Sequence, residues 1–330
     1  MQRYGSVAQL NRASDSGSAG HGFESHPSHS MMQCYIVMVA ASKDKTQKFC
    51  TADDVLEAMR MLENEEQRKI LMGFFKTGVG QYGEGDKFLG LRVPETRAVV
   101  KWSTNLPIDE VEKLLKSFWH EVRLCGFLIL VSQFEKAMKK LGKHQGVCQA
   151  NKHSHNILHS KDKRDEITRD EAMEQCDAIA MFYVRNARYA NNWDLVDMSC
   201  YKILGRWLLV QTNVEHKEKV AIFDRLAMSD NLWERRISMV STLATTMASD
   251  PSMALKYAEL HLRMFVQKPE WSHDLMHKAV GWMLREVGKR CDMNVLRDFL
   301  SKHAGTMPRT SLRYAIEQMN EDERKRWMAT

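Results

Sequence analysis

The sequence predicts an all-α protein, and three observations lead to this. The 330-residue chain is 44% apolar and 27% charged, which is typical of a globular protein. It has only 17 glycines and 6 prolines and is rich in Leu, Met, Ala, Glu, Lys and Arg, which favours helices over tight turns. From residue 51 onward apolar side chains recur at helical spacing, and no convincing run of alternating β-branched residues interrupts them.

The first helix is expected to begin after Thr51, whose hydroxyl can cap the amino end ahead of two aspartates. Residues 77–94 contain five glycines and a proline and are expected to form a long loop. The remaining helices are expected near residues 94–103, 108–117, 119–139, 165–188, 193–210, 216–228, 231–248, 252–267, 271–290, 293–303, 308–318 and 321–328.

The predicted helices recur in pairs from residue 108, at intervals of roughly 35–45 residues. This period favours HEAT-like helical hairpins stacked into an α-solenoid. Such a solenoid has a concave face, which we expect to bind an elongated partner such as a DNA duplex. Self-similarity between the repeats is too weak to prove the arrangement, so an irregular α-domain stays an alternative.

Two segments differ from the helical array. Residues 1–50 are expected to be disordered or non-native, because residues 1–30 are rich in Ser, Gly and His and lack helical periodicity. The codons allowed for Gly-Phe-Glu-Ser at 22–25 can contain the T-arm consensus of a tRNA gene, so residues 1–30 are interpreted as spurious translation. The authentic start is then expected at Met31, Met32 or Met38. Residues 51–330 are expected to form the domain, with an exposed insertion at about 140–164.

The basic charge is concentrated around this insertion. Residues 139–169 hold eight Lys and Arg against three Asp and Glu, whereas the whole chain has a net charge of +6. A zinc site is conceivable in the insertion, but the spacing matches no standard finger, and a solvated loop is expected. The residues concerned are Cys148, His153, His155 and His159. We therefore expect neither a metal nor a cofactor.

The cysteines and the apolar runs indicate the compartment. The seven cysteines are odd in number, scattered and without a CxxC pair, which predicts reduced thiols and a cytoplasmic protein. No apolar run reaches the length of a membrane span, so no membrane partner is expected.

The clearest functional signal lies in the helix expected at 271–290. Its apolar stripe consists of Val280, Met283, Leu284 and Val287. The opposite side carries Lys278, Trp282, Arg285 and Lys289. Core packing explains an indole among three cations poorly, whereas the cations suit phosphates and the indole suits a sugar or base. Packing against the next repeat is the structural alternative.

A second signal is the sequence NNWDLVD, in which Asn192 is expected to cap the helix that begins at Trp193. Trp193 and Asp197 are four residues apart and therefore share a face, on which Asp197 interrupts an apolar stripe. A carboxylate there is costly unless it is paired or used. Asp197 is therefore a candidate functional group, with a structural ion pair as the alternative, and Asp194 is assigned no role.

A third signal is the sequence LWERR, at the start of the helix expected at 231–248. Trp233 is expected to face the core and Arg235 to face solvent. Arg236 lies at the edge of the apolar face, where it can meet either Asp197 or a DNA phosphate.

These three segments resemble the DNA alkylation repair (AlkD-like) family, as does the N-terminal sequence FFKTGVGQYGEGDKFLGLRVPETR. The resemblance covers roughly residues 51–328, with a gap at 140–164. It implies that Asp197 is the essential carboxylate and that Trp193 and Trp282 flank the lesion. It further implies that Arg236 binds the DNA backbone near it.

The resemblance implies a monofunctional DNA glycosylase that acts on cationic N3- or N7-alkylated purines in double-stranded DNA and leaves an abasic site. A fixed carboxylate would stabilise the oxocarbenium ion that forms as the glycosidic bond breaks. We expect Lys278, Arg285 and Lys289 to contact phosphates, and a monomer associated with the nucleoid through DNA. The alternatives are a non-catalytic helical-repeat module that binds damaged or distorted nucleic acid, and a protein scaffold.

Overall fold

The protein is described by a computed structural model that covers residues 49–150 and 168–330, with side chains up to Gly142 in the first range. Within these ranges the regular structure is helical, apart from an isolated parallel bridge between Lys87 and Trp119. The chain divides into two compact units, and the boundary between them in the sequence falls between Gly126 and Phe127. Among the described helices, none combines the length and apolar character that crossing a membrane requires.

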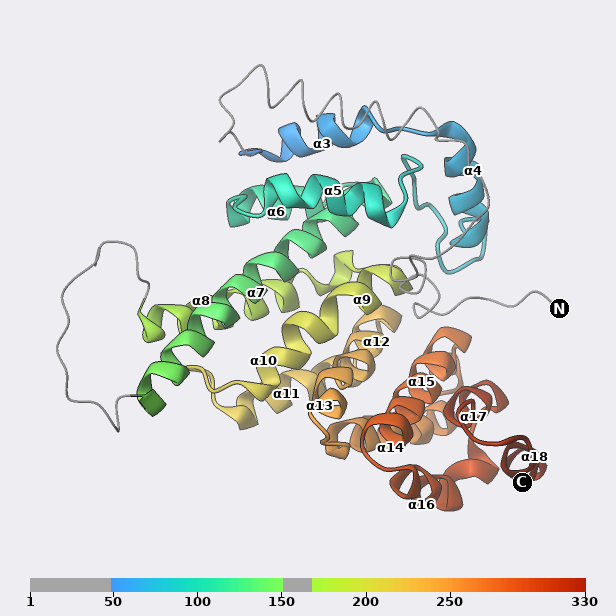
Figure 1. Ribbon diagram of the computed structural model, residues 1–330. Helices are drawn as coiled ribbons and strands as arrows, with labels where there is room; N and C mark the ends of the chain where they lie inside the picture. Colours follow the sequence, from blue (N-terminus) through green and yellow to red (C-terminus); the bar gives the residue numbers. More distant parts are fainter. Residues whose placement is uncertain (1–48, 151–167) are drawn as a thin grey trace, which may run out of the picture. The chain divides into compact units, whose positions relative to one another are not determined.

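From residue 49 onward, the first unit contains four helices and the beginning of a fifth (Figure 1). They are α3 (Ala52–Arg60), α4 (Glu65–Phe74), α5 (Val93–Ser103), α6 (Ile108–Leu115) and the first turns of α7 (His120–Ala150). Thr51 caps α3 as predicted, because its hydroxyl accepts a hydrogen bond from the backbone N–H of Asp54 at 3.1 Å. The fully buried side chains of Val55 and Met59 turn the inner face of α3 towards α5 and α6.

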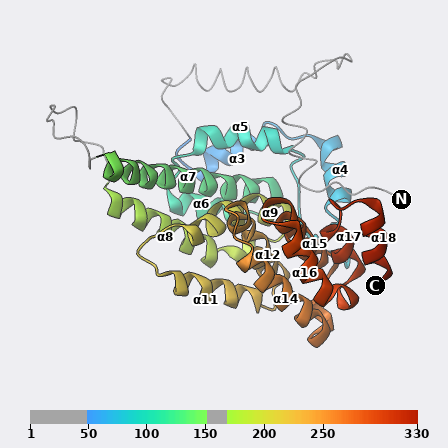
Figure 2. The same cartoon turned by 60° about the horizontal axis from the view of Figure 1, so that its bottom comes forward.

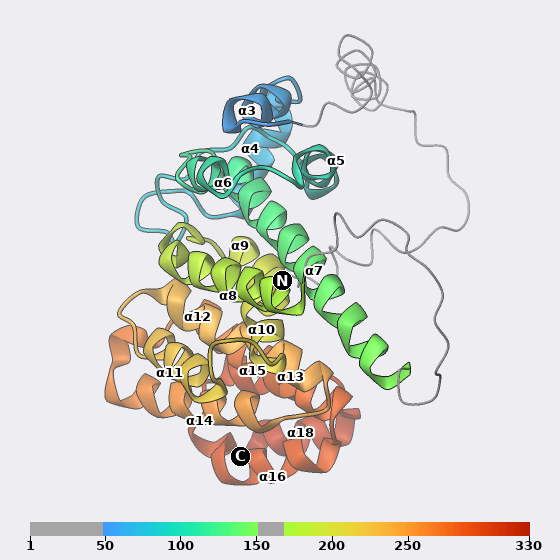
Figure 3. The same cartoon turned by 90° about the vertical axis from the view of Figure 1, so that its left-hand side faces the viewer.

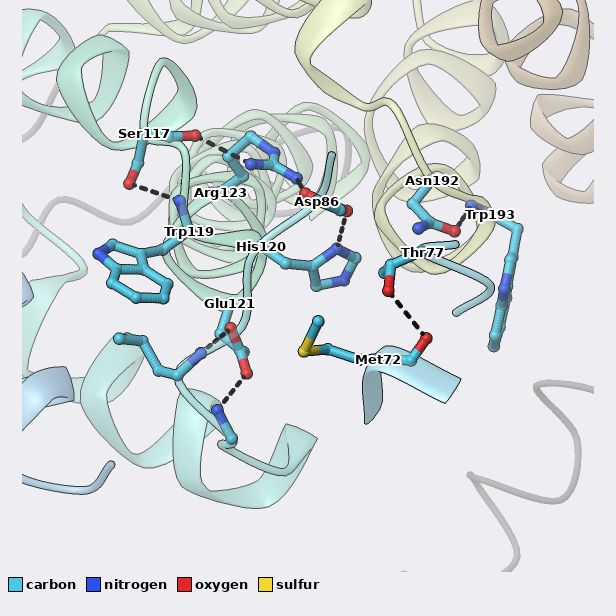
Figure 4. Close-up of polar contacts among 12 residues, drawn as sticks. Met72, Thr77, Asp86, Ser117, Trp119, His120, Glu121, Arg123, Asn192 and Trp193 are labelled. Carbon is cyan, nitrogen blue, oxygen red and sulfur yellow. Dashed lines mark hydrogen bonds and ion pairs between the residues drawn. The ribbon is translucent and has the colours of Figure 1, made fainter. Parts of the chain in front are cut away.

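The predicted loop between α4 and α5 is confirmed, and buried charges hold it in place (Figure 4). The Glu121 carboxylate accepts hydrogen bonds from the backbone N–H groups of Leu89, Gly90 and Leu91 at 2.9, 2.8 and 3.1 Å. Gly90 has a φ of +93°, a conformation that a residue with a side chain rarely adopts. The loop therefore depends on a glutamate that follows it by thirty residues in the sequence.

A second buried group in the same unit ties the loop to α7 (Figure 4). Asp86 accepts a hydrogen bond from Arg123 and contacts Nδ1 of His120 at 2.8 Å. Burial acts to raise the pKa of Asp86, but His120 and Arg123 outweigh it and hold the pKa below its usual value. Phe75 and Phe88 cover the His120 ring, with centroids 4.7 and 4.5 Å away. These contacts give the group a structural role.

The second unit contains the rest of the chain. It comprises the remainder of α7 and α8 (Arg169–Arg185), η1 (Ala187–Tyr189), α9 (Trp193–Cys200), the π-helix η2 (Tyr201–Gly205), α10 (Arg206–Leu209), α11 (His216–Ala227), α12 (Leu232–Ser241), α13 (Leu243–Met247), α14 (Ser252–Gln267), η3 (Pro269–Trp271), α15 (Asp274–Arg290), α16 (Met293–His303), η4 (Ala304–Thr306), α17 (Arg309–Ala315) and α18 (Glu321–Ala329).

Four of these helices form an inner row. In Figures 1 and 2, α9, α12, α15 and α17 follow one another, and each packs against the next. They begin at Trp193, Leu232, Asp274 and Arg309, so the repeat spacing is 39, 42 and 35 residues, within the predicted interval. A second row consists of α8, α11, α14 and α16, which pack on the inner helices and their extensions (Figure 3). The predicted helical-repeat fold is confirmed.

Glycines allow the inner helices to approach closely. A Cβ atom added to Gly281 of α15 would meet the Ser311 carbonyl and lie 2.6 Å from the Cβ of Tyr314 on α17. Gly205 stands in the same relation to α12 and α13, with the Cβ of Ala244 at 2.8 Å. Backbone contact at these points excludes any larger side chain.

Three predicted segments differ in detail. The helix expected at 193–210 contains the π-helix η2, and the helix expected at 231–248 breaks at Thr242 into α12 and α13. The helix expected at 119–139 continues as α7 to Ala150, over the first residues of the expected insertion. Residues 151–167 and the N-terminal 48 residues lie outside the described chain. The start-site expectation and the zinc hypothesis rest on them and on the Cys148 side chain.

Candidate functional site

The first turns of α9 place the candidate carboxylate. Asn192 caps this helix as predicted, since its Oδ1 accepts a hydrogen bond from the backbone N–H of Trp193 at 2.8 Å (Figure 4). One turn further, Asp197 is only 2% exposed and lies among fully buried side chains of α9 such as Val196 and Cys200. The conflict between residue type and helix face that the sequence showed is therefore present in the structure.

Arg236 resolves this conflict by pairing with Asp197. Its Nε donates to Oδ1 of Asp197 at 2.9 Å, and its Nη2 donates to Oδ2 at 2.7 Å. The two parallel bonds form the bidentate arrangement in which guanidinium and carboxylate fit best. Arg236 is itself only 4% exposed, so the pair is shielded from solvent on both sides.

The same arginine also reaches the next repeat. Its Nη1 donates a hydrogen bond to the backbone carbonyl of Leu275, in the first turn of α15. Arg236 on α12 thereby joins Asp197 on α9 to α15 and connects three consecutive inner helices. The sequence offered two partners for Arg236, and the structure shows the carboxylate, with the Leu275 carbonyl as a third group that sequence reasoning missed.

In the electrostatic environment of Asp197, the effect of burial on the pKa outweighs the effect of Arg236. Burial raises the pKa of its carboxyl above the usual value, and the charge and hydrogen bonds of Arg236 act against this. Asp194, which is also buried on α9, adds a repulsion that raises the pKa further. A change in the position of Arg236 would therefore change both the charge and the basicity of Asp197.

The two candidate tryptophans both reach the surface. Trp193 and Trp282 are partly exposed, whereas Trp207, Trp233 and Trp271 are buried. In α15, Trp282 is the one residue between Ala279 and Gly288 that is not buried. Trp233 faces the core as predicted. Packing between repeats thus leaves Trp282 partly exposed.

The three candidate cations of α15 have different surroundings. Lys278 is partly exposed and pairs with Asp274 at 2.7 Å, and Lys289 is exposed near the carboxyl end of the helix. Arg285 is only 7% exposed and forms an ion pair with Glu317. The helical wheel placed Arg285 on a solvent-facing side, and this was wrong, because α17 covers that part of α15.

The expectation that Arg235 faces solvent was also wrong. Arg235 is 3% exposed and stacks on the Trp271 ring, with the guanidinium carbon 4.4 Å from the centroid. Its Nη1 donates to the carbonyl of Ser229 at 2.7 Å, and burial lowers the pKa of the guanidinium. The indole that attracts it follows by more than thirty residues, so the LWERR segment alone could not reveal the contact.

Other buried charges of this unit have structural partners. Asp177 accepts hydrogen bonds from the Trp207 indole at 2.6 Å and from the backbone N–H of Asn213 at 3.0 Å. Lys219 donates to the carbonyls of Trp207 and Val210 at 2.9 and 2.8 Å, where α10 ends. Both groups stabilise the connection from α10 to α11. Across the described chain, no group of three or more His, Cys, Asp or Glu side chains is arranged to hold a metal ion.

One comparison with known proteins identifies the family, and another agrees with the fold. Residues 55–319 match the family described as DNA alkylation repair enzyme. A solved structure, the predicted DNA alkylation repair enzyme from Enterococcus faecalis, is similar with a TM-score of 0.51 and 16% identity, over 78% of this chain and 97% of that one. No curated protein matches the sequence. The match over most of the chain, together with the helical-repeat fold, shows that the protein belongs to the DNA alkylation repair enzyme family.

Proposed function

We propose that the protein is a monofunctional DNA glycosylase. It hydrolyses the N-glycosidic bond of cationic N3- or N7-alkylated purines in double-stranded DNA and leaves an abasic site. It acts as a monomer on the DNA of the cytoplasmic nucleoid, with the inner row of helices as its HEAT-like DNA-binding face. The observation that carries the proposal is the buried Asp197–Arg236 pair, which lies one turn from the partly exposed Trp193.

Asp197 supplies the group that this reaction needs. Alkylation at N3 or N7 makes the purine cationic and a better leaving group, and positive charge then develops on the deoxyribose. A fixed carboxylate stabilises that charge and can orient the attacking water. Loss of one such preorganised group typically costs about 3–4 kcal/mol of transition-state stabilisation, which is several hundredfold in rate.

Arg236 would link DNA binding to the availability of this carboxylate. In the free protein both oxygens of Asp197 accept hydrogen bonds from Arg236. A backbone phosphate next to the lesion is a competing bidentate partner for the guanidinium. When Arg236 turns to the phosphate, the Asp197 carboxylate is left to face the positively charged sugar.

The surface residues of α9 and α15 would hold the lesion. The indoles of Trp193 and Trp282 present electron-rich faces to a cationic nucleoside, each worth on the order of 1 kcal/mol. Lys278 and Lys289 stand three helical turns apart on α15, roughly 16 Å along the axis. They would contact separate phosphates, whereas Arg285 holds α15 against α17 through Glu317.

Release of free base from duplex DNA that carries N7-methylguanine tests the proposal. We expect release by the wild type and a loss of roughly a hundredfold or more in Asp197→Asn. Asp194→Asn is the matched control, because Asp194 is a buried carboxyl of the same helix that affects Asp197 only through its charge, and it should keep its rate within a few-fold. Equal rates for the wild type and Asp197→Asn would contradict the proposed role of Asp197.

A non-catalytic module that binds damaged or distorted nucleic acid is the second candidate. It is favoured by the low exposure of Asp197, 2%, and by the occupation of both its oxygens, as in a structural ion pair. If the wild type releases no base from the alkylated duplex but binds it as tightly as Asp197→Asn does, the binding module replaces the enzyme.

A further inference from the structure

Helices α17 and α18 pack together at the carboxyl end of the chain (Figure 1). Side chains of both helices line a cleft. Its volume is about 520 Å³. The charged residues that line it are Arg313, Glu317, Glu321, Arg324 and Lys325, and Ile316 and Met328 supply apolar wall. The volume is ample for a phosphate group together with part of the molecule that carries it.

The carboxylates of this cleft are already neutralised by other cations. Glu317 pairs with Arg285, which reaches it from α15. Glu321 pairs with Lys325 one turn further along α18, at 2.9 Å. The negative charges therefore offer little attraction to an additional cation, and the lysine offers little to an anion.

The two arginines of the cleft differ from these residues in their ion pairing. Within the described ranges, neither Arg313 nor Arg324 has a carboxylate within ion-pair distance. Arg313 donates only a long hydrogen bond, 3.4 Å, to the hydroxyl of Thr310. Two guanidinium groups from different helices thus line one cleft without neutralisation. Their planar forks of N–H donors match the oxygen atoms of a phosphate group.

We propose that this cleft binds a phosphate group through Arg313 and Arg324. Met328, which lines the cleft and is partly exposed, is suited to contact the organic part that a phosphodiester carries and a free phosphate ion lacks. Arg285, which pairs with Glu317 of the cleft, is one turn from Trp282 on α15, and this places the phosphate site on the repeat that follows the proposed lesion contact. In that setting the ligand is a backbone phosphate of DNA, and this part of the proposal rests on the proposed function.

The first test is the salt dependence of binding to an unmodified DNA duplex, with wild type and the double variant Arg313→Gln/Arg324→Gln. Loss of one neutralised phosphate should reduce the slope of log K against log salt by about 0.9. Arg326→Gln is the control, since Arg326 is an exposed arginine of α18 that does not line the cleft, and it should leave the slope unchanged. Unchanged melting temperatures would show that the exposed substitutions leave the fold intact.

A second measurement separates the two sources of phosphate. Inorganic phosphate alone is titrated by calorimetry into the wild type and the double variant. Saturable binding lost in the double variant, without a change in the DNA slope, would assign the site to a free phosphate. A reduced DNA slope would assign it to the duplex. If the DNA slope is unchanged and phosphate does not bind the wild type, the cleft is not a phosphate site.

This outcome can be distinguished from failure of the proposed function. The salt slope is measured on unmodified DNA and therefore does not depend on base release. If the wild type releases no base, the glycosylase proposal fails. The salt slope on unmodified DNA still tests whether the cleft binds a phosphate of DNA.

Discussion

The Asp197–Arg236 pair should make a large contribution to the stability of the second unit, and Arg236→Met tests this. The methionine removes the guanidinium, its two hydrogen bonds to Asp197 of 2.9 and 2.7 Å and its hydrogen bond to the Leu275 carbonyl, but it roughly keeps the volume of the side chain. It leaves a carboxylate that is 2% exposed without a counter-charge. Removal of one partner from a buried ion pair typically costs about 3–5 kcal/mol.

This cost is large compared with the free energy of unfolding of a typical domain, about 5–15 kcal/mol. For a unit of this size, about 2–4 °C of melting temperature is lost per kcal/mol, so the variant should melt roughly 6–20 °C lower. The unpaired Asp197 also has a pKa raised further by its burial. The native state of the variant then binds a proton at Asp197 more readily than the unfolded state does. The destabilisation should therefore be smaller at pH 5 than at pH 8.

Urea unfolding followed by circular dichroism measures these differences at both pH values. The double variant Asp197→Leu/Arg236→Met is the matched control, since it removes both charges and should recover most of the lost stability. A loss of less than about 1 kcal/mol in Arg236→Met, typical of an exposed pair, would refute the reasoning. The reasoning would also be refuted if the stability lost by the double variant equalled the sum of the losses in Arg236→Met and in Asp197→Leu.

Three further predictions concern packing and protonation. In urea unfolding, Gly281→Ala should lower the free energy of unfolding by about 1–3 kcal/mol or more, because the new methyl group meets α17. Gly73→Ala is the control and should be neutral or stabilising, because a Cβ atom at Gly73 has nothing within 4 Å. Burial lowers the pKa of His261 to about 3. The contribution of the neutral His261 to the free energy of unfolding is therefore fully present above pH 6.5 and falls by about 1.4 kcal/mol per pH unit below it. In unfolding experiments, His261→Gln should lose less stability between pH 6.5 and pH 5 than the wild type. Three buried thiols with raised pKa values should resist iodoacetamide until the protein unfolds, while the exposed Cys50 reacts at once, as peptide mass spectrometry can show. The protected thiols are Cys125, Cys176 and Cys200.

Much of the fold could be predicted because its determinants are local. Capping by Thr51 and Asn192 and the apolar stripe of α15 depend on residues within a few positions of one another. The repeat spacing follows from the succession of such helices. The π-helix η2 and the break at Thr242 could not be predicted, since they occur where neighbouring helices meet at Gly205.

The candidate site divides in the same way. The sequence alone determined that Asp197 shares a face with Trp193 and conflicts with the apolar residues around it, because angles around one helix axis follow from residue spacing. It left open whether Arg236 would meet that carboxylate or a DNA phosphate, and it did not indicate that Arg235 would stack on Trp271.

Only the tertiary structure determined which polar sides of the inner helices are buried and which are exposed. In a helical repeat, an inner helix is packed on both flanks, so a side that appears polar in isolation can be covered by the next helix. Arg285 is buried for this reason, because α17 brings Glu317 to it. Trp282, three residues earlier, stays partly exposed on the same helix. The sequence determined the faces of each helix, and the packing of its neighbours determined which of those faces solvent or DNA can reach.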